Sequence, residues 1–173
     1  MDGDIALKLR VANGTHTAVA HVMALSSLLL TDVLSSDAKQ HQNEGSILRN
    51  YLDAFFESQI LPGAADTYGL QETKCVYDDW RRRLCHAHFG LSSFFITQNG
   101  DAKAGLRIAP TIQSLIKNDK VRKSILTNNV SYIQSLLLFF DWSPNTRKND
   151  YKTHVVSFLF LFSNISNFQF QSL

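Results

Sequence analysis

Apolar residues recur every three or four positions along most of this chain, which is the spacing of helices that each bury one face. The pattern predicts a first helix over residues 5–34 and a second helix over residues 46–60. Ser46 is the expected N-cap of the second helix. Pro62 and Gly63 are its expected end, because proline lacks an amide donor and glycine accepts a left-handed turn. These periodicities predict a mostly α-helical fold.

Further helices are predicted downstream. Val76, Trp80 and Leu84 recur at four-residue spacing and define a third helix. Additional helices are predicted over residues 89–98, over residues 111–117 after Pro110, and over residues 130–142. Polar or glycine-containing segments between the helices predict loops at residues 35–45 and 63–69, and a turn at residues 99–101.

The composition excludes several classes of protein. The chain has 173 residues, and 17 Lys and Arg against 15 Asp and Glu give a net charge of +2, too small for counterion-driven binding of nucleic acid. Hydrophobic residues make up 45% of the chain, which excludes disorder over its whole length. Two cysteines cannot form a disulfide scaffold, and the first residues do not read as a charged-then-apolar leader, so we expect a cytoplasmic protein.

The C-terminal part of the sequence differs from the rest. Residues 155–173 carry no charge and alternate Phe with Leu and then Phe with Gln. A transmembrane helix needs about 20 mostly apolar residues, whereas the second half of this segment contains Ser, Asn and Gln, so no membrane partner is expected. We expect a helical domain over residues 1–142 and a divergent tail over residues 143–173.

A cluster of polar residues lies on the first predicted helix. Lys8, Asn13 and His16 all fall on one side of a helix that turns about 100° per residue. A lysine can take a proton from an alcohol, an asparagine amide can donate to the resulting alkoxide, and a histidine can orient or relay. Spacing alone also allows three unrelated surface residues at a helix start. Gly14, in the same segment, indicates either a helix start or a close approach to the backbone.

The segment containing this cluster reads KLRVANGTHTA from Lys8 to Ala18 and resembles the K-x-R-x-x-N-G-x-H signature of the long-chain mannitol dehydrogenase family. That family contains polyol 2-dehydrogenases and the fructuronate and tagaturonate reductases. The resemblance implies Lys8 as the general base, Asn13 as part of the oxyanion site and His16 as a substrate contact. It also implies the multi-helical C-terminal substrate domain of such an enzyme, with NAD or NADP as coenzyme and no metal.

A second segment extends the resemblance. Residues 99–110 read NGDAKAGLRIAP and resemble the family's D/N-G-S-x-K-x-x-x-R-x-L-P element, so that Lys103 and Arg107 are implied as substrate-binding residues. Polyol dehydrogenases carry an arginine where this chain has Phe95, and the uronate-reductase branch carries a small polar residue there. The string N-G-T-H-T is closer to that second branch.

The dinucleotide-binding part of these enzymes has no counterpart in the sequence. No G-x-G-x-x-G motif occurs, although hydride transfer requires a nicotinamide ring held against the substrate carbon. The resemblance therefore implies a fragment that is inactive alone and that needs a nucleotide-binding domain as its partner. The expected function is the interconversion of a secondary alcohol of a polyol or hexonate and its 2-keto form. The alternative is a non-catalytic helical remnant that binds a partner through exposed apolar surface.

Cys75, Cys85, His86 and His88 form a second candidate cluster, with the spacing C-x9-C-H-x-H. Structural zinc sites usually present paired ligands such as C-x2-C, so no metal site is expected here, and Cys85 is expected to be a small buried residue.

Three consecutive arginines, residues 81–83, follow two aspartates and are expected to form a solvated helix face, with anion binding as the alternative. His21 is expected in the core or at its boundary, and Trp80 and Trp142 are expected to be packing anchors.

Overall fold

The computed structural model describes residues 2–117, and within this range 81% of the residues are helical and none forms a strand. The mostly α-helical prediction is confirmed for this part of the chain. No helix in the same range is long and apolar enough to cross a membrane. Contacts divide the chain into residues 1–122 and 123–173. The helix expected at residues 130–142, Trp142 and the expected tail lie outside the described residues.

The first helix contains a π-helical segment in its middle. It consists of α1 (Asp2–Lys8), the π segment η1 (Leu9–Asn13) and α2 (Gly14–Leu25). The predicted continuation to residue 34 is wrong, because Ser27 adopts a left-handed φ of 59° directly after the last turn and ends the helix. Residues 31–34 form a separate 3₁₀ turn, η2 (Thr31–Leu34).

The second helix is also interrupted by a π segment and is longer than the sequence predicts. It consists of α3 (Gln42–Phe55), η4 (Phe56–Ile60) and α4 (Leu61–Tyr68). Pro62 does not end it, because proline lies in the first turn of α4, where its missing amide is tolerated. Gly63 continues the helix as well.

Both boundaries of the second helix therefore differ from the prediction. It begins one turn before Ser46, after the 3₁₀ turn η3 (Lys39–His41), so Ser46 is not its N-cap. The loop predicted at 63–69 is helical up to Tyr68. Gly69, with a φ of 86°, separates this helix from the next because its backbone lies in the left-handed region that glycine accepts.

The remaining helices of the described range follow the predicted order. α5 (Leu70–Leu84) confirms the helix around Trp80, and α8 (Ala109–Lys117) confirms the helix after Pro110. The helix predicted at 89–98 shrinks to α6 (Ser93–Thr97), and a further helix, α7 (Gly100–Arg107), follows the turn at Asn99, whose φ is 54°.

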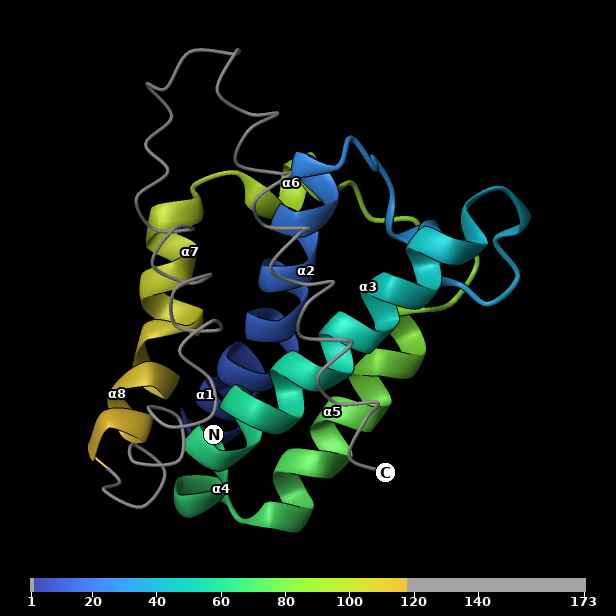
Figure 1. Cartoon of the computed structure of the whole chain (residues 1–173). Coiled ribbons are helices and arrows are strands. Elements are labelled where there is room, and N and C mark those ends of the chain that lie inside the picture. Colours follow the sequence, from blue (N-terminus) through green and yellow to red (C-terminus); the bar gives the residue numbers. More distant parts are fainter. Residues whose placement is uncertain (1, 118–173) are drawn as a thin grey trace, which may run out of the picture. The chain divides into compact units, whose positions relative to one another are not determined.

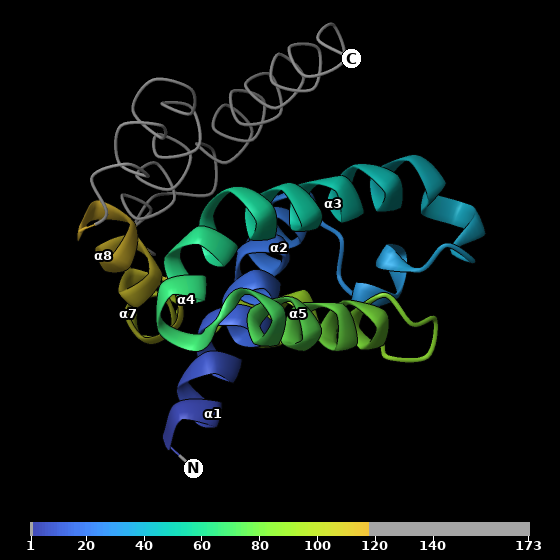
Figure 2. The ribbon, with the colours of Figure 1, turned by 90° about the horizontal axis from the view of Figure 1, so that it is seen from below.

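Helix α2 lies at the centre of this unit (Figure 1). Every residue from Gly14 to Met23 is buried, because α2 contacts α3, α6 and α7 along its length. The buried polar side chains of α2 bond within the fold, as Thr15 does to the carbonyl oxygen of Val11 and Thr17 does to Arg107. Helices α3 and α5 are amphipathic instead and bury one face each, and α1 extends beyond the other helices in Figure 2.

An ion pair ties α3 to α5. Asp53 accepts hydrogen bonds from Nε (2.5 Å) and Nη2 (2.7 Å) of Arg81 and from the hydroxyl of Tyr77 (2.5 Å). The Tyr77 ring stacks on Phe56 with ring centroids 3.7 Å apart. Burial and the neighbouring carboxylate raise the pKa of Tyr77. Arg81 is thus half-buried between two helices, and the prediction of a solvated face is wrong for this one arginine.

Candidate functional site

The two segments that resemble family motifs meet at the N-terminal end of α2. Arg107, at the end of α7, donates through Nη1 to Thr17 Oγ1 at 2.8 Å, and the same nitrogen lies 3.3 Å from His16 Nε2. A Cβ added to Gly14 would lie 3.1 Å from the carbonyl oxygen of Arg107. The close backbone approach predicted as one interpretation of Gly14 is therefore confirmed.

His16 is buried and neutral. Only 8% of the residue is exposed, and its ring lies 5.3 Å from that of Trp80, measured between centroids. Burial lowers the pKa of His16 to about 3, and the positive charges of Arg107 and Lys103 act in the same direction. The second ring nitrogen, Nδ1, is buried without a hydrogen-bond partner in the described part of the chain, and so is Nε1 of Trp80.

Lys103 lies one turn before Arg107 on α7. Its Nζ donates to the backbone carbonyl oxygens of Phe95 (3.1 Å) and Ile96 (2.9 Å), and it lies over the Phe95 ring, 5.7 Å from the centroid. Partial burial and the charge of Arg107 lower the pKa of Lys103. Phe95, where the sequence departs from polyol dehydrogenases, is thus in direct contact with Lys103, which the resemblance implies as a substrate-binding residue.

Lys8 and Asn13 are placed differently. Lys8 is exposed in the last turn of α1, and Asn13 is partly exposed at the end of the π segment. A rotation of 100° per residue does not apply through a π segment, so the argument that placed these residues on one side with His16 no longer holds. Among residues 2–117, no hydrogen bond or ion pair joins Lys8 to Asn13 or His16, and the assigned roles of Lys8 and Asn13 stay predictions.

Comparisons with known proteins add nothing to the geometry of the site. No family model, curated protein or solved structure matches the chain. The likeness to mannitol dehydrogenases rests on the motif residues alone.

Arg10 is a residue for which the sequence predicted no role. It is 7% exposed, and its guanidinium donates to the carbonyl oxygen of Gly63 (2.5 Å) and to the hydroxyls of Thr111 (3.2 Å) and Ser114 (3.0 Å). It also lies 5.5 Å from the ring centroid of Tyr68. Arg10 therefore fastens the π segment before His16 to α4 and α8. The apolar neighbours Val11 and Ala12 were the only local sign that this arginine is buried.

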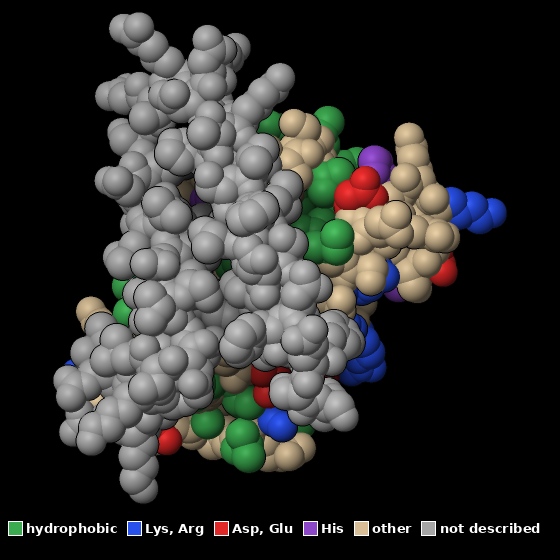
Figure 3. Space-filling model, viewed as in Figure 1, with side chains coloured by type: hydrophobic (Ala, Val, Ile, Leu, Met, Phe, Trp, Pro, Cys, Tyr) green, Lys and Arg blue, Asp and Glu red, His purple; other side chains and the backbone are tan. Residues whose placement is uncertain are grey.

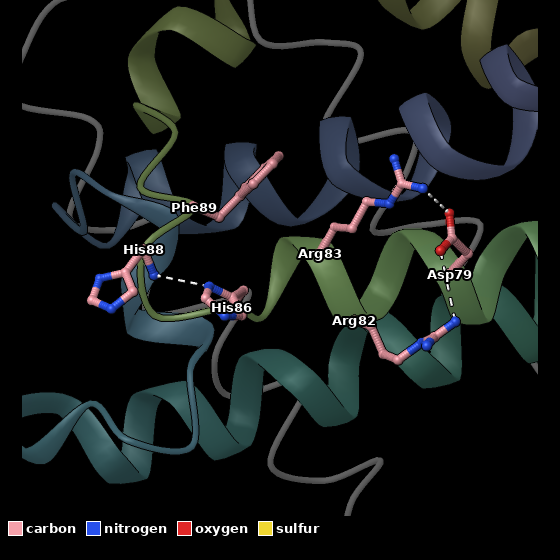
Figure 4. A pocket seen from close by; sticks show the side chains of 6 residues that line it. All are labelled: Asp79, Arg82, Arg83, His86, His88 and Phe89. Atoms are coloured by element: carbon pink, nitrogen blue, oxygen red, sulfur yellow. Dashed lines mark hydrogen bonds and ion pairs between the residues drawn. The ribbon is translucent and has the colours of Figure 1, made fainter.

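An open pocket at the end of α5 contains the other charged cluster (Figure 4). Arg82 and Arg83 both turn toward Asp79, with N–O distances of 3.6 and 2.7 Å, and their side chains are 79% and 64% exposed. His86 Nδ1 accepts from the backbone amide of His88. The solvated face is confirmed for these two arginines, and the carboxylate of Asp79 already pairs with both of them.

The zinc alternative gains no support within residues 2–117, where no group of three or more metal-ligating side chains comes together. Cys75 is exposed and Cys85 is partly buried, and burial raises the pKa of Cys85, which disfavours the thiolate. His21 is 7% exposed, as predicted for a core or boundary residue, and Trp80 packs between His16 and Phe89 as an anchor. On the coloured part of the surface in Figure 3, basic and acidic side chains are scattered among uncharged ones.

Proposed function

We propose that this chain forms the substrate-binding part of a mannitol-dehydrogenase-like oxidoreductase that interconverts a secondary alcohol of a polyol or hexonate and its 2-keto form. The observation that carries the proposal is the 3.3 Å contact between Arg107 Nη1 and His16 Nε2. These residues are 91 positions apart and belong to the two segments that resemble motifs of one substrate site. If the likeness of either segment to the family motif were due to chance, there would be no reason to expect the two segments to be in contact.

The charges around the site suit an oxygen-rich ligand. Arg107 and Lys103 place two positive charges at the site, and neutral His16 lies against Arg107. Arginine and lysine donate strong hydrogen bonds to carboxylate and hydroxyl oxygens, and few polar groups placed around an apolar wall are typical of small-molecule sites. Trp80 supplies such a wall next to His16.

The proton chemistry falls to Lys8 and Asn13 in this proposal. Lys8 would accept the proton of the alcohol during oxidation and return it during reduction, and the Asn13 amide would donate to the alkoxide oxygen. Lys8 is exposed to solvent, which a proton acceptor needs in order to exchange its proton with water.

The nicotinamide coenzyme does not fit the described residues. Residues 2–117 contain no strand on which a dinucleotide-binding fold could form, and the sequence has no G-x-G-x-x-G motif. A separate nucleotide-binding domain, on the same or another chain, would therefore have to supply NAD or NADP.

Binding of the substrate class tests the proposal without the coenzyme. Mannitol and sodium gluconate, one polyol and one hexonate, are titrated into the full chain by calorimetry. At least one is expected to bind saturably, and His16→Gln and Lys103→Gln are each expected to weaken that binding about tenfold or more, which corresponds to about 1.4 kcal/mol. Arg82→Gln, which removes an exposed cation elsewhere, is the matched control and is expected to bind as the wild type. Absence of saturable binding of both ligands would contradict the proposal.

A second candidate function, an interaction module, is favoured by exposed apolar side chains at one end of α2. Residues 28–30 pair with the start of α6, since the amide of Ser93 donates to the carbonyl oxygen of Leu29 at 2.8 Å. Leu29, Phe94 and Phe95 in these segments are 58%, 55% and 65% exposed. If partner binding is the function, Phe95→Asp abolishes capture of the partner, whereas His16→Gln leaves it unchanged.

A further inference from the structure

The contact between Arg107 and His16 determines which nitrogen of the imidazole carries the proton. A guanidinium stays protonated and can only donate, so the His16 Nε2 atom that faces Arg107 Nη1 at 3.3 Å has to accept. A neutral imidazole has one donor and one acceptor nitrogen. The proton of His16 is therefore on Nδ1.

The same arginine nitrogen is held in place by a second hydrogen bond. Arg107 Nη1 carries two hydrogens, and the other one is donated to Thr17 Oγ1 at 2.8 Å. Thr17 is fully buried and follows His16 directly on α2, so the helix places both acceptors side by side. The contact to His16 is thus part of a two-point attachment of α7 to α2.

The Nδ1 atom of His16 takes no part in this attachment. It is buried and has no hydrogen-bond partner among the described residues, in a residue that is only 8% exposed. A buried donor without an acceptor destabilises the folded state, and such groups in native proteins call for an explanation. An oxygen atom of a bound ligand would satisfy it.

We propose that Arg107 is a positioning residue that holds His16 in the tautomer with the proton on Nδ1, so that His16 donates a hydrogen bond to an oxygen atom of the substrate. The identity of the substrate rests on the function proposed above, whereas the tautomer does not. Arg107, which the resemblance treats as a substrate contact, acts on the ligand through His16.

Protonation of the ring would remove this arrangement, because an imidazolium cannot accept from Arg107. The charged groups that act on His16 are Arg107 and Lys103, both on α7 and both positive. They oppose a second proton on the ring together with burial. The tautomer is therefore expected to persist throughout the neutral and mildly acidic pH range.

Long-range ¹H–¹⁵N correlation spectra of the ¹⁵N-labelled full chain report the protonation of each histidine nitrogen. With assignment from His16→Gln, we expect a protonated Nδ1 and an unprotonated Nε2 for His16 between pH 5 and 8. A proton on Nε2, or titration of His16 in the range of free histidine, would overturn the proposal. This measurement needs no variant of Arg107 and no ligand.

Arg107→Met then removes the donor while keeping an apolar stem of similar length. We expect His16 to shift toward the Nε2–H form and its pKa to rise. His21 is the internal control, because its Nδ1 lies 2.8 Å from the Thr17 carbonyl oxygen, an acceptor that does not depend on the Arg107 side chain. An unchanged His16 tautomer in a variant with wild-type circular dichroism would overturn the role of Arg107.

The ligand arm uses mannitol and sodium gluconate with the same variant. For the ligand that binds the wild type, we expect Arg107→Met to lower the affinity by about tenfold or more. Wild-type affinity in Arg107→Met, with an altered His16 tautomer, would overturn the donor role of Nδ1. If neither ligand binds the wild type while the Nδ1–H tautomer is observed, the proposed substrate class fails and the positioning role of Arg107 stands.

Discussion

Individual side chains in this protein owe their chemistry to their surroundings more than to their type. Lys103 and Arg107 lie on one helix but contact different acceptors. The lysine donates to backbone carbonyl oxygens, whereas the arginine donates to the Thr17 side chain and faces His16. Arg10, two positions after the exposed Lys8, is buried among hydrogen-bond acceptors. A motif read from sequence cannot distinguish these environments.

A dependence of stability on pH follows from the two buried histidines. Burial lowers the pKa of His16 from 6.5 to about 3, and it lowers that of His21 as well. Between about pH 6.5 and pH 3 the unfolded chain binds more protons than the folded chain. The free energy of unfolding is therefore at its full value above about pH 6.5 and decreases as the pH falls toward 3. A tenfold difference in proton affinity between the folded and unfolded chains corresponds to about 1.4 kcal/mol, so the loss amounts to several kcal/mol.

Urea denaturation of the full chain at pH 7 and at pH 4.5 measures this loss. His16→Gln is expected to reduce the difference between the two unfolding free energies, because the variant has no ring to protonate. His88→Gln, which replaces an exposed histidine, is the matched control. The same difference in His16→Gln as in wild type would contradict the assignment of His16 as a buried neutral group.

At the scale of elements, the two π segments stand out. Each of them, Leu9–Asn13 and Phe56–Ile60, joins two α-helices without a break, and the two segments contact each other. In each case a hydroxyl bonds to a carbonyl oxygen one turn back: Thr15 to Val11 at 2.7 Å and Ser58 to Ala54 at 2.6 Å. Such segments recur at functional sites because they redirect side chains. The first π segment, Leu9–Asn13, lies in the sequence between Lys8 and His16 and changes their relative orientation around the helix.

Close packing of α4 on α8 gives a test at this scale. A Cβ at Gly63 would lie 2.7 Å from Thr111 Cγ2 and 2.9 Å from the Thr111 carbonyl oxygen. Gly63→Ala is therefore expected to destabilise the protein by about 1–3 kcal/mol, because the backbone of α8 has to move. Gly105→Ala, in helix α7 with nothing within 4 Å, is the control and is expected to be stabilising by about 0.5–1 kcal/mol. Urea denaturation monitored by circular dichroism measures both, and a neutral Gly63→Ala would contradict the packing.

At the scale of the whole molecule, the described unit is arranged around α2, which carries His16, Thr17 and His21 into the core. Helices α7 and α5 bring Arg107 and Trp80 to this helix from positions far along the chain. The candidate site therefore exists only when the helices are assembled. Loss of the tertiary fold is expected to abolish ligand binding completely even where helices persist.

The general-base role proposed for Lys8 can be tested by kinetics. With a nucleotide-binding domain and its coenzyme present, Lys8→Ala is expected to lower turnover about 10²- to 10⁴-fold while the coenzyme affinity changes less than about twofold, because the lysine acts on the alcohol proton. Steady-state kinetics and coenzyme titration measure the two effects. Lys39→Ala, an exposed lysine outside the motif, is the control. Equal turnover of wild type and Lys8→Ala would remove the assignment, and NADH formation by this chain alone would contradict the need for a second domain.

The sequence by itself determined the helical class and the approximate centres of α3, α5 and α8, because apolar spacing, capping and turn residues act over a few positions. It also predicted catalytic roles for Lys8, Asn13 and His16 and substrate contacts for Lys103 and Arg107, and these roles stay predictions. The tertiary structure decided that the second helix continues through Pro62, that Arg10 is buried, and that His16 is neutral. These properties depend on contacts between residues 53 to 101 positions apart, and no local pattern encodes the distance at which two helices pack.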